Sequence, residues 1–220
     1  MEACKGETLV LYHEVKLPKE RNGKNPLVIF LHGVGSNEKH LFGFAHQFPE
    51  NFIVVSARAP FNVGVDKYAW FEVQFLANKR IINEEQEAKS VQILNQFISQ
   101  AVERYGADEQ QVFLVGFSQG AIMSYTMGLI RPNKIKAVVA IAGRLLEQTK
   151  GLMASKEALK QIQFLIQQGS KDQMMPMQYG EDAAGFLSSI GVQYEMKRYA
   201  IEHFVSQEEM NDLINWIKTR

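Results

Sequence analysis

Short, continuous apolar runs separated by longer helical segments constrain the fold of this chain more than any other feature. The clearest runs are Leu27–Leu31, Phe52–Ala57, Val112–Val115, Ile135–Ala142 and Phe164–Ile166. Runs with so few polar residues are typical of strands that are covered on both faces, as in a parallel sheet between two layers of helices. The segment Leu9–Leu17, closed by Pro18, is expected to be an edge strand or a hairpin arm, and the more polar segment Tyr194–Tyr199 is expected to be a strand toward an edge of that sheet.

The segments between the runs have helical periodicity. In Glu84–Tyr105 the apolar residues recur at intervals of three and four, and Gly106 suits the C-terminal stop of a helix. Ser206 and Glu209 form a capping box that opens a final amphipathic helix. Strands that alternate with helices imply βαβ units with right-handed crossovers. We therefore predict a doubly wound α/β fold in one domain spanning residues 1–220, with a mostly parallel sheet, helices on both faces and no large lid.

The overall composition argues against several classes of protein. Twenty-four basic residues balance twenty-four acidic ones, so no net charge attracts the chain to nucleic acid. No apolar stretch approaches the ~20 residues needed to span a bilayer, and Met1–Glu7 lacks the apolar core of a signal peptide. The single cysteine, Cys4, cannot form an internal disulfide. We expect a cytoplasmic protein with no nucleic-acid partner and no integral membrane segment, and the sequence leaves open whether it forms a homodimer.

The segment Gly116–Gly120, with the sequence GFSQG, matches the pattern G-x-S-x-G. It follows the apolar run Val112–Val115 and precedes the helical segment Ala121–Ile130, which is the context of a nucleophile elbow. In such an elbow the glycines allow a very tight turn, and the serine stands out at the end of the sheet. The alternative is that Ser118 serves only as an ordinary helix N-cap. The strand before it and the helix after it favour the nucleophile.

A serine nucleophile needs a base to take its proton. Of the five histidines only His203 follows Ser118, and an α/β hydrolase has its acid and then its histidine after the nucleophile. Asp172 comes shortly after a predicted strand, so we predict that it orients His203. Asp182 lies within a predicted helix, and Glu202 adjoins His203 on an extended segment. These two carboxylates are the weaker candidates.

Acyl transfer also requires two donors for the developing oxyanion. One is the backbone N–H of the residue after the nucleophile, which is Gln119. The second comes from the loop after an early strand, and we assign it to the backbone N–H of Val34 in the turn His32–Gly35. A glycine-rich turn without a ligand is the alternative. A dinucleotide site is disfavoured because Glu38 stands where the third glycine of that fingerprint belongs.

Several segments, taken together and in order, resemble a known family. They are Leu31–Glu38, Arg58–Pro60, Tyr68–Phe71, Gly116–Gly120 and Gly169–Asp172 followed by Pro176. The chain resembles the phospholipase/carboxylesterase family, which includes the acyl-protein thioesterases, and Ser36–Glu38 with Arg58–Pro60 is similar to its bacterial esterase branch. The resemblance implies an α/β-hydrolase fold and the same catalytic and oxyanion residues. Two departures are Ala200–Glu202, where the family has a glycine before the histidine, and Ala121 in place of a second glycine after the elbow.

The resemblance further implies that Trp70 and Phe71 border the active-site cleft. Met174, Met175 and Met177 follow the predicted acid, and they are candidates for the lining of an acyl pocket. For all five side chains the alternative is packing in the core.

These inferences predict a serine carboxylesterase that hydrolyses a small carboxylic ester through an acyl-enzyme, with no metal or organic cofactor. An acyl-protein thioesterase or lysophospholipase remains an alternative within acyl hydrolysis. A catalytically silent hydrolase-fold binding protein is the alternative from another class. A dienelactone-type hydrolase is disfavoured because it carries cysteine where this chain has Ser118.

Overall fold

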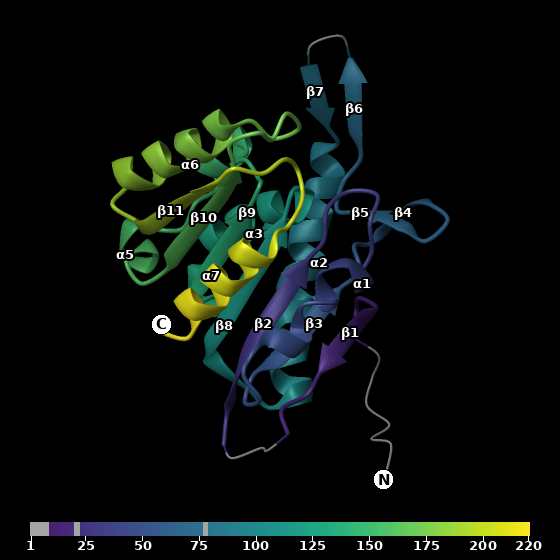
Figure 1. The fold of residues 1–220 in the computed structure, drawn as a ribbon, viewed down its shortest axis with the longest axis vertical. Coiled ribbons are helices and arrows are strands. Elements are labelled where there is room, and N and C mark those ends of the chain that lie inside the picture. Colours follow the sequence, from purple (N-terminus) through teal and green to yellow (C-terminus); the bar gives the residue numbers. More distant parts are fainter. Residues whose placement is uncertain (1–8, 20–22, 77–78) are drawn as a thin grey trace.

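A seven-stranded sheet forms the centre of the computed structural model, which describes residues 9–19, 23–76 and 79–220 (Figure 1). The strands lie in the order β1 (His13–Lys16), β3 (Ile53–Ala57), β2 (Asn25–Leu31), β8 (Ala107–Phe117), β9 (Ala137–Ile141), β10 (Gln163–Gly169) and β11 (Gln193–Tyr199). Only β1 is antiparallel to its neighbour, and the other pairs are parallel. Cys4 and Met1–Glu7 lie outside the described residues.

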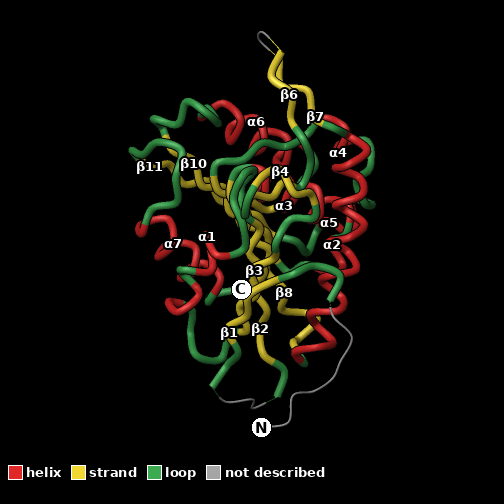
Figure 2. Tube along the Cα trace, turned by 90° about the vertical axis from the view of Figure 1, so that its right-hand side faces the viewer, coloured by secondary structure: helices red, strands yellow, loops and turns green. Residues whose placement is uncertain are grey.

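Helices cover both faces of this sheet (Figure 2). On one face lie α2 (Glu84–Tyr105), α3 (Gln119–Ile130) and α6 (Met177–Ser189), and on the other lie α1 (Lys39–Phe42) and α7 (Gln207–Ile217). The remaining helical pieces are short: the 3₁₀ turns Ala45–Gln47 and Pro132–Lys134, and the helices α4 (Glu147–Lys150) and α5 (Lys156–Leu159). The predicted doubly wound α/β fold with a mostly parallel sheet is confirmed.

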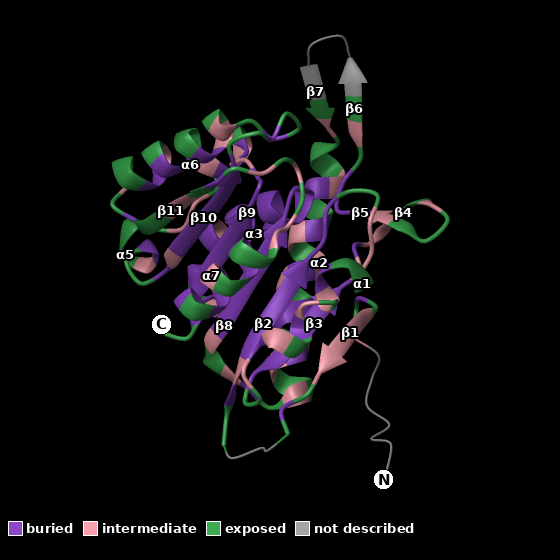
Figure 3. Ribbon diagram, viewed as in Figure 1, coloured by how far each residue is buried: buried purple, intermediate pink, exposed green. Residues whose placement is uncertain are grey.

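Burial follows the hydrophobic pattern of the sequence (Figure 3). The strands β3 and β9 are buried at every position, as expected for strands with helices on both sides. In contrast, β1 is only half-buried along its length and β11 is exposed over its first three residues. These two strands form the edges of the sheet, which confirms the edge position predicted for β11 from its polarity and the edge-strand interpretation of the segment that contains β1. No helix of the described residues is long and apolar enough to cross a membrane.

Local signals set the ends of the two best-predicted helices. At the start of α2 the side chain of Asn83 accepts a hydrogen bond from the backbone N–H of Gln86, and Gly106 ends the helix with φ of 63°. At the start of α7 Ser206 and Glu209 form the reciprocal capping box. The helix bounds predicted for α2 are confirmed, because each end carries its own chemical signal.

Two small antiparallel hairpins were not predicted from the sequence. The first pairs β4 (Phe61–Gly64) with β5 (Lys67–Ala69), and the second pairs β6 (Val73–Leu76) with β7 (Lys79–Ile82). The second hairpin projects beyond the sheet (Figure 1). Its base, at Val73 and Ile82, reaches the candidate site described next.

Candidate active site

Ser118 stands on a sharp turn between β8 and α3. Its backbone has φ of 55° and ψ of −114°, a conformation that a non-glycine residue adopts only when the surroundings impose it. A Cβ on Gly116 would lie 2.2 Å from the carbonyl oxygen of Gly120, and a Cβ on Gly120 would lie 1.9 Å from that of Leu31. The two glycines are therefore required by close backbone packing, and this packing holds the serine in its strained conformation.

The structure brings Ser118, His203 and Asp172 into one hydrogen-bonded chain. The Nε2 atom of His203 lies 3.0 Å from Ser118 Oγ, and its Nδ1 atom lies 2.7 Å from Asp172 Oδ2. The other carboxylate oxygen of Asp172 accepts hydrogen bonds of 2.8 Å from the backbone N–H groups of Met174 and Met175. These bonds fix the carboxylate, so Nδ1 of the histidine donates to it and Nε2 faces the serine as an acceptor.

The two weaker candidates for the acid lie elsewhere. Asp182 is exposed on α6, where it accepts a hydrogen bond of 2.8 Å from Gln178, four residues earlier. Glu202 is also exposed. Neither carboxylate contacts the ring of His203 in the described structure, whereas Asp172 does.

The unusual segment before His203 packs through its backbone. A Cβ on Gly169 would lie 2.5 Å from the carbonyl oxygen of Ile201, and the backbone N–H of Lys171 donates to the same oxygen at 3.0 Å. Because the side chains of Ile201 and Glu202 are partly or fully exposed, this contact between the two loops does not depend on them. The departure from the family pattern at Ala200–Glu202 therefore leaves the position of His203 intact.

The two predicted oxyanion donors lie beside the serine. Gln119 is the first residue of α3, so its N–H has no acceptor within the helix. In the described part of the chain the N–H of Val34 has no acceptor either. A Cβ on Gly33 would lie 3.3 Å from the Cβ of Ser118, so the loop passes close to the serine. Val34 and Gln119 both line the same hollow as Ser118 and His203.

A buried ion pair supports the loop that carries Val34. Arg58 donates from Nε and Nη2 to the two carboxylate oxygens of Glu38 at 2.7 and 2.8 Å, and Glu38 is fully buried. The guanidinium lies between the rings of Tyr12 and Tyr68, 4.2 and 4.5 Å from their centroids. Burial is the largest influence on the pKa of Glu38 and raises it, but the hydrogen bonds and charge of Arg58, a backbone hydrogen bond and the charge of Lys39 together lower that pKa below its usual value. Sequence reasoning placed these residues in separate motifs and missed their pairing.

His32 also supports this loop and takes no part in the hydrogen-bonded chain. Its Nε2 atom accepts a hydrogen bond of 3.0 Å from the backbone N–H of Ala59, and its Nδ1 atom donates to the carbonyl of Gly33 at 2.8 Å. This pattern requires a neutral imidazole. Burial lowers the pKa of His32 to about 4, which agrees with the neutral form.

Trp70 does not line the site, and its predicted role as a substrate-contacting residue is corrected here. Its side chain has no exposed surface, and its indole N–H donates to the carbonyl of His32 at 3.0 Å. Its backbone N–H donates to the side-chain oxygen of Gln119 at 2.7 Å, and the side-chain amide of Gln119 donates to the carbonyl of Phe71 at 2.6 Å. Trp70 thus belongs to the layer behind the site, and Gln119 ties this layer to the elbow.

A small, mostly apolar pocket of about 110 Å³ opens at Ser118. We call it the inner pocket. Its lining residues are Val34, Phe71, Val73, Ile82, Ser118, Gln119, Ile122, Arg144, Met174, Met175 and His203. Phe71, Met174 and Met175 were predicted to line a site, whereas Met177 is absent from this lining. The sequence analysis missed four lining residues: Val73, Ile82, Ile122 and Arg144. Of these, only Arg144 carried a signal that could have found it, because it stands two residues after the apolar run that forms β9.

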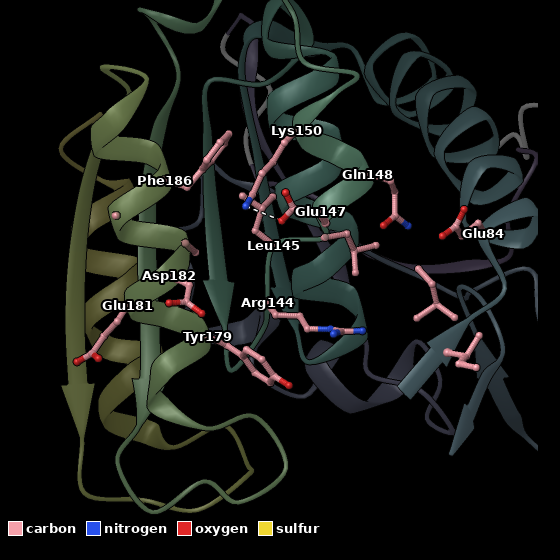
Figure 4. A pocket seen from close by; sticks show the side chains of 15 residues that line it. Glu84, Arg144, Leu145, Glu147, Gln148, Lys150, Tyr179, Glu181, Asp182 and Phe186 are labelled. Carbon is pink, nitrogen blue, oxygen red and sulfur yellow. Dashed lines mark hydrogen bonds and ion pairs between the residues drawn. The ribbon is translucent and has the colours of Figure 1, made fainter. Parts of the chain in front are cut away.

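A second hollow of about 850 Å³ adjoins the inner pocket and shares Ile82 and Arg144 with it (Figure 4). We call it the outer cavity. Its lining consists mainly of residues from α4, α6 and the loop after β9, and it also includes Ile81, Ile82 and Glu84. The two hollows together offer a small apolar space at the serine and a larger charged space beside it.

The inner pocket combines a serine, a histidine that faces it, a carboxylate behind the histidine and two backbone N–H groups without an acceptor among the described residues. This set can carry out acyl transfer by attack of a hydroxyl on a carbonyl carbon. Within the described ranges no three His, Cys, Asp or Glu side chains gather closely enough to hold a metal ion.

Fold and site together define a serine hydrolase with an α/β-hydrolase fold. The chain belongs to the phospholipase/carboxylesterase family, whose model matches residues 12–220. As a member of this family it is a hydrolase of ester or thioester bonds. The resemblance found in the sequence is thereby confirmed.

Relatives of known sequence and structure support this membership. The chain is 28% identical to acyl-protein thioesterase 1 of Kluyveromyces lactis over 215 residues, which cover 90% of this chain and 93% of that protein. It is 27% identical to carboxylesterase SOBER1 of Arabidopsis thaliana over 205 residues, covering 88% and 90%. The crystal structure of esterase PE8 superposes with a TM-score of 0.82 at 25% identity, covering 95% of this chain and 98% of that one.

Proposed function

We propose that this protein is a serine carboxylesterase that hydrolyses small carboxylic esters. The observation that carries the proposal is the hydrogen-bonded chain from Ser118 through His203 to Asp172 at the mouth of a 110 Å³ apolar pocket. The carboxylesterase and esterase relatives support it.

In the proposed mechanism His203 takes the proton of Ser118 at Nε2 while Oγ attacks the ester carbonyl carbon. Asp172 stabilises the imidazolium that forms, and the backbone N–H groups of Val34 and Gln119 bind the oxyanion. The C–O bond to the alcohol then breaks, and His203 returns the proton to the leaving oxygen. Water attacks the acyl-enzyme by the same route and releases the acid and the free serine.

The size of the inner pocket favours a short group next to the reacting carbonyl. Its volume of about 110 Å³ is well below the roughly 300–1,000 Å³ typical of sites that enclose a drug-sized ligand. The outer cavity, at about 850 Å³, has room for the other part of the ester.

Thioester hydrolysis is the second candidate, because the Kluyveromyces lactis relative is an acyl-protein thioesterase. A thioester passes through the same tetrahedral intermediate and needs the same residues. Parallel rates on esters and thioesters with identical acyl groups would separate the two activities.

The deciding experiment measures steady-state hydrolysis of p-nitrophenyl esters from acetate to long chains, beside matched thioesters. We expect the highest kcat/KM with short esters, and Ser118→Ala should remove the activity while circular dichroism shows an unchanged fold. Turnover that survives in Ser118→Ala would refute the assignment of the nucleophile. If the wild type turns over no substrate, absence of labelling by a fluorophosphonate would favour a catalytically silent binding protein.

A further inference from the structure

Arg144 lies where the inner pocket meets the outer cavity, and its side chain lines both. It follows β9, which lies between β8 and β10 in the sheet. Ser118 follows the carboxyl end of β8, and Asp172 follows that of β10. Arg144 follows the carboxyl end of β9 between them, so all three residues lie at the same edge of the sheet. Among the described residues that line the inner pocket, Arg144 alone has a permanent charge.

The backbone before Arg144 is held in an uncommon conformation. Ala142 has φ of 49°, and its N–H donates to the carbonyl of Gln167 at 2.8 Å. A Cβ on Gly143 would lie 2.5 Å from the Cβ of Ala121, at the start of α3. A positive φ and a required glycine together fix the direction in which the chain leaves β9. Arg144 is therefore placed by tight packing against the elbow helix and does not depend on a mobile surface loop.

The guanidinium of Arg144 lacks a counter-ion in the described structure. Its Nε atom is buried without a hydrogen-bond acceptor, and no described carboxylate lies within 4.0 Å of its nitrogens. Its nearest aromatic partner is the ring of Tyr179, 5.8 Å from the guanidinium carbon. A partly buried cation with an unsatisfied donor is costly. Arg58, by contrast, pairs with Glu38 through two hydrogen bonds.

None of the carboxylates that line the outer cavity forms an ion pair with Arg144 in the described structure. Glu147 pairs with Lys150 at 2.6 Å, and Glu181 pairs with Arg198 at 3.3 Å. Figure 4 shows the Arg144 side chain extended away from Glu181 and Asp182. The unpaired charge therefore faces the space in which a substrate would lie.

From this arrangement we infer that Arg144 binds a carboxylate carried by the ester substrate, close to the scissile bond. The inference rests on the proposed function and names its substrate class: esters with a short apolar spacer that ends in an anion. The apolar side chains of Phe71, Ile122 and Met175 suit the spacer. A guanidinium recognises a carboxylate through two parallel hydrogen bonds. The carboxylate belongs to the acyl part or to the alcohol part of the ester, and substrates can distinguish these two sources.

The test uses two pairs of esters that differ only in charge. Monoethyl glutarate and ethyl isoheptanoate place a carboxylate or an isopropyl group on the acyl part. Acetoxyacetate and isobutyl acetate do the same on the alcohol part. For each pair the ratio of kcat/KM, anionic over neutral, is measured by titration of released acid. For at least one pair we expect this ratio to fall about tenfold to hundredfold in Arg144→Met, mainly through KM, and to recover partly in Arg144→Lys.

Lys160→Met is the matched control, because Lys160 lines neither hollow and forms an exposed ion pair with Glu157. It should leave both ratios unchanged. An equal loss on anionic and neutral esters in Arg144→Met, or no change in either ratio, would overturn the inference. Ser118-dependent turnover of the neutral esters would show that the proposed function still stands in that case.

A binding measurement decides the matter if turnover is too slow. Ser118→Ala is titrated with each anionic ester by calorimetry, with and without Arg144→Met. Binding that weakens about tenfold or more in the double variant supports the inference. Equal affinity in the two proteins contradicts it, whatever the outcome for catalysis.

Discussion

The inner pocket and the outer cavity share a wall but differ in how they are built. The inner pocket is small and mostly apolar, and it lies at the carboxyl ends of the sheet strands, where ligands bind in open α/β sheets. The outer cavity is several times larger, and charged side chains from helix surfaces line it. The larger hollow is therefore not the place where the chemical groups converge. Convergence depends on strand ends, which hold loops from distant parts of the chain at fixed positions.

The polar groups behind the two hollows differ as well. Behind the inner pocket, Glu38 is fully buried and accepts hydrogen bonds from the Nε and Nη2 atoms of Arg58. In the outer cavity, Lys150 and Glu147 form a single contact between residues three positions apart, and Glu147 is highly exposed. Exposed pairs contribute roughly 0–1 kcal/mol, whereas removal of one partner from a buried pair costs about 3–5 kcal/mol. Substitutions should therefore matter most near the serine and least in the outer cavity.

Asp172→Asn should produce the largest effect among the substitutions that test this contrast. The amide can present its N–H toward His203 and thus favour the wrong tautomer. By analogy with other triads we expect kcat to fall about 10⁴-fold while the fold remains intact. Asp182→Asn on the exposed face of α6 is the matched control and should leave kcat unchanged. If Asp182→Asn proved the damaging change, the assignment of the acid would be wrong.

Arg58→Met should produce the largest loss of stability, because it leaves the carboxylate of Glu38 buried without a partner. We expect the free energy of unfolding to fall by about 3–5 kcal/mol, measured by urea denaturation. The loop of Val34 loses its support, so kcat should fall as well. Lys19→Met, which removes an exposed pair with Glu50, should change stability by less than about 1 kcal/mol. Similar losses in both variants would mean that the buried pair contributes no more than a surface pair.

The buried His32 should make stability depend on pH. Its pKa of about 4 in the folded protein is below its usual value near 6.5, so the unfolded chain binds the proton first as the pH falls. Stability from this group is present above the usual pKa and decreases toward pH 4. Between pH 7 and pH 5 the loss should be about 2 kcal/mol. In His32→Asn the free energy of unfolding, measured by urea denaturation at each pH, should depend less steeply on pH than in the wild type. Substitution of the exposed His46 should leave this pH dependence unchanged.

Lys150→Met should have the smallest effect, because it removes only weak contacts in the outer cavity, with the exposed Glu147 and with the ring of Phe186 5.0 Å from Nζ. We expect a change in the free energy of unfolding below about 0.5 kcal/mol and no change in kcat on neutral esters. A large loss of activity would show that the outer cavity takes part in catalysis and would weaken the contrast between the two hollows.

Several elements were predictable because their signals are local. The cores of the strands follow the apolar runs of the sequence. The helix α2 begins after the N-cap Asn83 and ends before Gly106, and α7 begins at the capping box of Ser206 and Glu209. The elbow was predictable because two glycines flank Ser118 between a strand and a helix. The hairpin of β6 and β7 was not predicted, because its strands are short and pair only with each other.

The sequence by itself determined the strands of the central sheet, the longer helices and the candidates for nucleophile, acid and base, because these depend on local patterns and on the order of residues along the chain. Only the tertiary structure decided which of these groups meet and what lies around them. Trp70 is fully buried behind the site, and Glu38 is paired with Arg58. Arg144 lines both hollows without a carboxylate partner among the described residues. These features depend on contacts between segments that are far apart in the chain. The order of the strands in the sheet brings such segments together, and a local sequence pattern does not reveal it.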